Sequence, residues 1–86
     1  MDDPNQAFKD QLDLEHEWPS LYMFKFIVPK GGEAQIEALF TPDQISSKLS
    51  KRGNYVSVTA KLTMQSSEEV IAIYQAAYQI EGIIAL

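Results

Sequence analysis

The chain contains no cysteine and only one histidine, His16, among its 86 residues. Without cysteine there is no disulfide framework, no thiolate metal site and no cysteine nucleophile. A single histidine in a polar segment leaves too few side chains for a zinc site or for a preorganised Ser-His-Asp arrangement. We therefore predict no enzyme activity, no metal site and no cofactor. We expect His16 itself to be exposed or satisfied by a hydrogen bond.

Long apolar runs and a basic leader are also missing from the sequence. The longest unbroken apolar run is only a few residues long, whereas a helix that crosses a bilayer needs about 20 apolar residues. The chain begins Met-Asp-Asp-Pro, which is acidic where a secretory signal would be basic. We expect a cytoplasmic protein without a membrane partner. A chain of this length has room for one hydrophobic core, so we expect one domain.

The net charge of −5 comes from one end of the chain. Residues 1–18 hold six acids and one base, whereas residues 19–86 hold six of each. Residues 1–17 are polar, contain Pro4, and have few apolar side chains to offset the entropy of ordering the backbone. We predict a flexible acidic segment over residues 1–17 and a single domain over residues 18–86.

A docked helix is the alternative for the acidic segment. Phe8, Leu12 and Leu14 can form one apolar face of a short helix that runs from about Asn5 to Leu14. The sequence leaves this choice open, because three apolar side chains are a weak signal for packing.

Two segments have the composition and alternation of β-strands. Residues 21–28 lie between two prolines and are rich in aromatic and β-branched side chains, which favours a strand. Residues 55–64 alternate apolar and polar side chains with little error. We predict that the even-numbered side chains of both segments face the core. The predicted centre of the core consists of Phe24, Phe26, Val58, Leu62 and Tyr74.

Two further strands have weaker signals. Residues 43–52 carry few apolar anchors among serines and lysines, which is typical of an edge strand. Residues 83–86 follow a glycine and are too few for a helix, so they are predicted to be the last strand. The pair Gly53-Asn54 predicts a two-residue hairpin turn with positive φ.

Two helices are predicted between these strands. Residues 33–40 carry apolar side chains at the i, i+3 and i+4 spacing of a helix. Residues 66–82 begin with Ser66 and Glu69, the spacing of a capping box, and end in a glycine.

The resulting order is strand, helix, strand, strand, helix, strand, which predicts an α+β fold. Right-handed crossovers then give a four-stranded antiparallel sheet in the order 4-1-3-2, with both helices on one face. The other face of the sheet stays open to solvent. The side chains predicted on this open face are Met23, Lys25, Ile27, Tyr55, Ser57, Thr59, Lys61 and Thr63.

Three short motifs carry a resemblance to a known family. The run from Lys51 to Val58 has the letters KRGNYVSV, Trp18-Pro19 precedes the aromatic-Lys-aromatic run of residues 24–26, and the chain ends with Gly-Ile-Ile-Ala-Leu. In this order and spacing, over roughly residues 18–86, the chain resembles the small bacterial YbeD-like family, also called domain of unknown function 493. The resemblance implies a ferredoxin-like fold of the kind found in ACT-like regulatory domains. It carries over no catalytic residue.

The bases of the domain gather in one stretch. Residues 44–67 hold four bases and no acid. Apolar side chains inside a positive rim are typical of a surface that docks an acidic protein segment. We therefore predict a regulatory or interaction domain with a protein partner, and we expect the acidic segment of this same chain to cover the surface until a partner displaces it. The predicted partner-binding residues are Met23, Lys25, Ile27, Lys48, Lys51, Arg52, Tyr55 and Lys61.

A small-molecule site is the alternative function. Lys30, Gly31 and Gly32 lie between a predicted strand and a predicted helix, where backbone N–H groups and a lysine can face an anion. The family resemblance implies an amino acid or metabolite as the ligand near this turn. Nucleic-acid binding is not expected, because Tyr55 is the only aromatic side chain predicted on the open face and the net charge is negative. We expect a monomer or a weak homo-oligomer.

Overall fold

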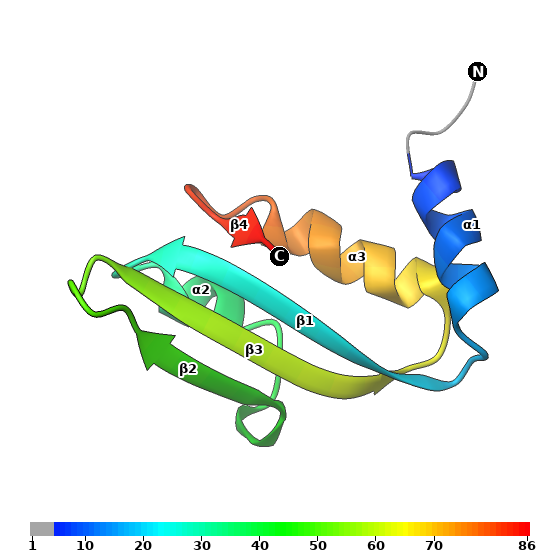
Figure 1. Ribbon diagram of the computed structural model, residues 1–86, viewed down its shortest axis with the longest axis horizontal. Helices are drawn as coiled ribbons and strands as arrows, with labels where there is room; N and C mark the ends of the chain where they lie inside the picture. The colour runs from blue at the N-terminus through cyan, green and yellow to red at the C-terminus, as the bar shows by residue number, and fades with distance from the viewer. Residues whose placement is uncertain (1–4) are drawn as a thin grey trace.

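The computed structural model describes residues 5–86, and this part of the chain forms an antiparallel sheet with helices packed on it (Figure 1). The elements in chain order are α1 (Gln6–Glu15), β1 (Ser20–Pro29), α2 (Glu33–Glu37), a one-turn 3-10 helix (Pro42–Gln44), β2 (Ile45–Leu49), β3 (Tyr55–Met64), α3 (Ser67–Ala77) and β4 (Ile84–Ala85).

The sheet has the strand order β2-β3-β1-β4, with each neighbouring pair antiparallel. This is the predicted order 4-1-3-2 counted from the other edge, so the predicted fold class is confirmed. The two ten-residue strands β1 and β3 pair along their full length, with Phe26 opposite Val58. At one edge of the sheet, β4 adds only two residues opposite Phe26 and Ile27.

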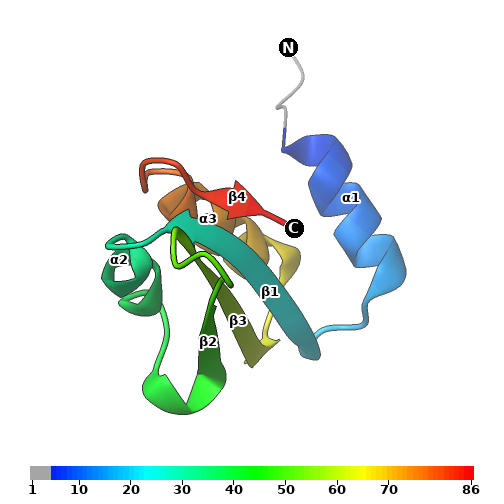
Figure 2. The same cartoon turned by 60° about the vertical axis from the view of Figure 1, so that its left-hand side comes forward.

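The even-numbered side chains of β1 and β3 face the core, as the alternation predicted. Phe24, Phe26 and Val58 have no exposed surface. They pack in one cluster with Ile36 from α2 and Val70 from α3, so both of these helices cover the same face of the sheet (Figures 1 and 2). Strand geometry explains the result, because successive side chains of a strand point to opposite faces.

Two side chains predicted at the centre of the core are only partly buried, Leu62 and Tyr74. Strand β2 pairs with β3 only from Val56 to Ala60, so Leu62 lies beyond the end of its neighbour. The Tyr74 ring packs against Phe24, but its hydroxyl lies 3.1 Å from the Tyr22 hydroxyl near the surface. Burial raises the pKa of Tyr74, and the hydrogen bond with Tyr22 raises it further.

The hairpin between β2 and β3 is wider than predicted. Its connection spans residues 50–54 rather than two residues. Gly53 has the expected positive φ of 74°, but Asn54 does not share it. The Gly53 amide donates to the Ser50 carbonyl at 2.9 Å, and the Ser50 amide donates to the Tyr55 carbonyl at 2.8 Å. The side-chain spacing alone did not reveal this longer turn.

The start of α3 differs from the predicted capping box in one bond. The Ser66 hydroxyl accepts from the Glu69 amide at 3.2 Å, as expected for an N-cap. The Glu69 carboxylate accepts from the amide of Gln65 at 2.9 Å, one residue before the N-cap. Both helices also end earlier than predicted, α2 at Glu37 and α3 at Ala77.

The acidic segment contains a docked helix over the residues that the structure describes. Helix α1 packs against α3, beside the first turn of that helix (Figure 1), and its Leu12 side chain is 3% exposed within the core cluster. The Phe8 ring lies edge-on to the Tyr74 ring. Residues 6–15 therefore form the docked helix of the alternative prediction and not a flexible segment. The apolar surface that buries Leu12 exists only in the folded domain, so the sequence does not show it. Asp2 and Asp3 lie outside the described residues.

Candidate docking surface

The odd-numbered side chains of β1 and β3 form the open face, and the strand register sets their neighbours. Met23 lies opposite Lys61, and Lys25 lies opposite Thr59. Lys25 and Lys61 are therefore diagonal neighbours rather than a direct cross-strand pair, which reduces the repulsion between them. Met23 is exposed over 57% of its surface.

The edge strand extends this face at one end. Lys48 of β2 lies opposite Ser57 of β3, and Ser57 lies opposite Ile27 of β1 on its other side. On the far side of Ile27 lies Ile84 of β4. One row across the sheet thus places a cation at the β2 edge and apolar side chains toward β4.

A hollow of about 410 Å³ lies where β2 and β3 join. It brings together four of the predicted partner-binding residues: Ile27, Lys48, Lys51 and Tyr55. A second hollow is lined by Tyr55 and Lys51 too, and also by Arg52. The remaining predicted residues, Met23, Lys25 and Lys61, lie further along the same face and do not line either of these two hollows. We call the residues Ile27, Lys48, Leu49, Ser50, Lys51, Tyr55 and Ser57 the hairpin hollow.

Leu49 and Ser50 also line the hairpin hollow, although neither was predicted to bind a partner. Leu49 is the last residue of the short edge strand and is 50% exposed. Its apolar character indicated a core anchor, whereas its position at the strand end leaves half of it in solvent. Ser50 also fixes the hairpin, because its Oγ accepts from the Tyr55 amide at 3.2 Å.

The cations of this surface are not paired with acids inside the domain. Within residues 5–86, the ion pairs shorter than 4.0 Å all involve Lys9 of α1. Positive charge on the open face and the hairpin therefore has no internal carboxylate partner in the described part of the chain. The cations concerned are Lys25, Lys48, Lys51, Arg52 and Lys61.

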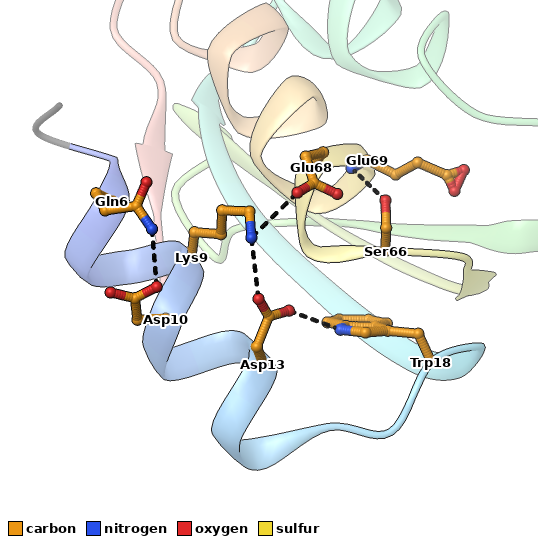
Figure 3. Close-up of polar contacts among 8 residues, drawn as sticks. All are labelled: Gln6, Lys9, Asp10, Asp13, Trp18, Ser66, Glu68 and Glu69. Atoms are coloured by element: carbon orange, nitrogen blue, oxygen red, sulfur yellow. Dashed lines mark hydrogen bonds and ion pairs between the residues drawn. The ribbon is translucent and has the colours of Figure 1, made fainter.

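The acidic helix does not cover this surface, contrary to our expectation. Helix α1 lies at the opposite end of the molecule from the β2–β3 connection (Figure 1). Lys9 bonds Asp13 and Glu68 at 3.1 Å each, and Asp13 also accepts from Trp18 Nε1 at 2.9 Å (Figure 3). These contacts orient the helix toward α3, where Leu12 is buried, and away from the hairpin.

In the turn at residues 30–32, the alternative site for a small anion, the backbone amides are already hydrogen-bonded within the chain. Gly31 has a φ of 102°, and its N–H donates to the Glu33 carboxylate at 2.6 Å. The N–H of Gly32 donates to the carbonyl of Pro29 at 2.9 Å. An internal carboxylate thus occupies the place that an anionic ligand would take. The side chain of Lys30 is exposed, and its backbone amide donates to Asn54.

The single histidine lies outside this surface and has a structural environment. His16 is half-buried, its Nδ1 lies 3.2 Å from Ser20 Oγ, and its ring stacks on Trp18, so the expected hydrogen bond is present. Residues 5–86 contain no group of three or more metal-ligating side chains that could hold an ion. No helix in this range is long and apolar enough to cross a membrane.

The order of elements and the open face define a βαββαβ domain of the α+β class. The family model described as "Protein of unknown function (DUF493)" matches residues 13–86, and the chain belongs to this family. The predicted resemblance is confirmed, and the match starts inside α1, five residues before the range on which the resemblance rested. No curated protein and no solved structure matches the chain.

Proposed function

We propose that this domain is a non-catalytic regulatory module that docks an acidic segment of a protein partner on its open sheet face. The observation that carries the proposal is the set of five cations around exposed apolar side chains without an internal acid partner. Like charges on one face repel each other, and an acidic partner removes that repulsion. The cytoplasmic location and the monomeric or weakly associating state remain predictions from the sequence.

The chemistry of the hairpin hollow supports a protein segment as the partner. Tyr55 and Ile27 provide apolar surface, and Lys48 and Lys51 provide positive charge at its rim. Interfaces commonly combine an aromatic anchor with a polar rim in this way. The hollow lies on a hydrogen-bonded hairpin, so binding there requires little ordering of the domain.

The test compares two variants with the same change in net charge. The double variant Lys51→Gln with Arg52→Gln removes two charges from the hairpin, and Gln35→Glu with Gln79→Glu adds two acids at exposed positions on the helical side. The probe is the peptide acetyl-(Glu-Val)4-amide, with its binding followed by NMR titration. We expect the hairpin variant to bind at least tenfold more weakly and the helical variant to bind about as well as the parent.

Salt and peptide charge provide the controls. The affinity should fall between 0.05 and 0.5 M salt, as a rough range, because the Debye length is only about 10 Å at 0.1 M. A peptide with lysine in place of glutamate should not bind. Equal losses in both charge variants would show a general charge effect and would place the functional surface elsewhere.

The turn at residues 30–32 fits a small anionic ligand less well than the open face fits an acidic segment. Its Gly31 amide is bonded to Glu33, and the neighbouring hollow is also lined by an acid, Glu81. Thermal melting against a panel of amino acids and metabolites is the measurement that would revive the small-molecule alternative, since a ligand of the folded state raises the melting temperature.

A further inference from the structure

We propose that the acidic partner segment binds in extended form, as an added strand along the outer edge of β2. This inference rests on the proposed function, and it specifies how the partner is held. Three observations support it: the free edge of β2, the contact of that edge with the hairpin hollow, and the charge beside it.

The first observation is that β2 ends the sheet. The strand order leaves it with β3 on one side and no strand of residues 5–86 on the other. The Ser50 amide donates to the carbonyl of Tyr55, the first residue of the neighbouring strand β3, so Ser50 directs its backbone groups toward β3. Backbone direction alternates along a strand, so Ser47 and Leu49 direct their N–H and C=O groups to the outer edge. Unpaired edge groups of this kind accept an added strand.

The second observation is that the free edge and the hairpin hollow are continuous. Lys48 and Leu49 belong to β2, and both line the hollow. The two residues after them, Ser50 and Lys51, line it as well. A segment that pairs with the outer edge of β2 therefore runs along the side of the hollow, where its side chains reach the cations and the half-exposed Leu49.

The third observation is the positive charge beside the β2 edge, which favours this edge and an acidic partner segment. Lys48 lies on the edge strand itself, and Lys51 and Arg52 follow in the connection. None of these three has a carboxylate partner within residues 5–86. Side chains of an extended peptide alternate between two faces, so acids spaced two apart all point to the side of the sheet that carries the cations. We infer a partner segment in which acidic and apolar residues alternate.

The other edge of the sheet fits such a segment less well. Strand β4 pairs with only two residues of β1, and the amide of Leu86 already donates to the carbonyl of Lys25 at 2.8 Å. The acidic helix α1 lies at the other end of the molecule from the β2–β3 connection (Figure 1). Strand β4 carries no charge, whereas β2 carries Lys48. The Glu37 carboxylate accepts from the Ser47 hydroxyl of β2 at 2.7 Å, but Ser47 and Lys48 are adjacent in the strand and point to opposite faces of the sheet.

The experiment uses the full chain and three forms of acetyl-(Glu-Val)4-amide: unmodified, N-methylated at every valine, and N-methylated at every glutamate. In a paired strand, alternate residues direct their N–H groups to the neighbour, so one methylated form loses its inter-strand bonds and the other keeps them. We expect one form to bind at least tenfold more weakly than the unmodified peptide and the other to bind within about threefold of it. Amide hydrogen exchange at Ser47 and Leu49 should slow when the unmodified peptide is bound.

The outcomes separate this inference from the docking function. If both methylated peptides bind as well as the unmodified one and still respond to Lys51→Gln with Arg52→Gln, strand addition is wrong and docking stands. If the unmodified peptide does not bind the folded chain, both proposals are overturned. Protection of the Ser47 and Leu49 amides that rises with protein concentration, without peptide, would assign this edge to a second copy of the chain and would also overturn the inference.

Discussion

The ammonium group of Lys9 lies 3.1 Å from a carboxylate oxygen of Glu68, so a cation in the acidic segment connects α1 to the first turn of α3 (Figure 3). The same ammonium lies 3.1 Å from Asp13 on its own helix. The side chain of Glu68 is 65% exposed and that of Asp13 is 40% exposed, and ion pairs open to solvent contribute little to stability. The contact therefore sets the orientation of α1, whereas burial of Leu12 supplies most of the free energy of docking.

Substitutions of two leucines on α1 test whether burial of Leu12 stabilises the docked helix. Leu12 is 3% exposed and Leu14 is 88% exposed. We predict that Leu12→Ala lowers the free energy of unfolding by about 2 kcal/mol, as expected for a buried leucine with a partly open surrounding, and that Leu14→Ala changes it by less than about 0.5 kcal/mol. Urea denaturation followed by circular dichroism measures both. Equal effects would mean that α1 does not dock through Leu12.

Acid should break the polar contacts of α1 while the burial of Leu12 keeps the helix on the domain. The hydrogen bond from Trp18 is the main cause that holds the pKa of Asp13 below its ordinary value, with Ser67 and Lys9 adding to it. The hydrogen bond from Lys9 lowers the pKa of Glu68. Lowered carboxylate pKa values mean that the contacts stabilise docking at neutral pH and are lost as the pH falls through the lowered values. The loss of these contacts is therefore expected below about pH 4, since ordinary carboxylates titrate near 4.

Trp18 is the only tryptophan and reports directly on the loss of its contact with Asp13. Its Nε1 donates to Asp13, so its fluorescence should change in a step at acid pH. Asp13→Asn should remove the step, and Asp10→Asn, on the same helix, should keep it. A step that survives in Asp13→Asn would assign the signal to another group.

Two neighbouring residues of β1 test which of its side chains face the core. Phe24 has no exposed surface, whereas Met23 is 57% exposed on the open face. We predict that Phe24→Ala costs about 3 to 5 kcal/mol, which is close to the whole stability of a small domain. Met23→Ala should cost less than about 1 kcal/mol. Chemical denaturation measures both, and a neutral Phe24→Ala would contradict the packing of β1.

Alanine substitutions at two glycines with nearly the same φ distinguish the cost of backbone strain from the cost of a steric clash of the new Cβ atom. Gly53 has a φ of 74° with open space where a Cβ would lie, and Gly82 has a φ of 76° with Pro29 Cγ at 2.8 Å from that position. We predict that Gly53→Ala costs about 1 kcal/mol from strain alone. Gly82→Ala should cost at least about 1 kcal/mol more, because Pro29 must also move. Similar melting temperatures for the two variants would show that the contact with Pro29 is easily relieved.

Local sequence patterns predicted the features of this fold that depend only on residues close together in the chain. The alternation in residues 55–64 predicted β3 with its bounds, and the inward-facing parity of Phe24 and Val58 followed from the same rule. The sequence could not show the depth of Leu62, because that depends on where β2 stops pairing with β3. It also could not show whether Asn54 shares the turn conformation of Gly53, because inter-strand bonds of Ser50 set the turn.

The candidate surface also has some features that residue types predict and others that only the strand register determines. Residue types alone indicated that bases and apolar side chains share one face, but the strand register decided that Ile27, Lys48 and Tyr55 meet in one hollow while Met23 lies apart from it. Leu49 was not selected, because an apolar residue in an edge strand has the same pattern whether it faces the core or solvent. The occupied amide of Gly31 depends on the rotamer of Glu33, which no pattern reports.

By itself, the sequence determined the order of the elements, the faces of the strands and the separation of charge along the chain, because each follows from periodicity or composition over a few residues. Only the tertiary structure decided where the acidic segment goes. Leu12 is one apolar residue in a polar segment, and its burial depends on the surface between α3 and the sheet. The packing of that surface turned a segment with little local preference into helix α1 and left the cations of the open face uncovered.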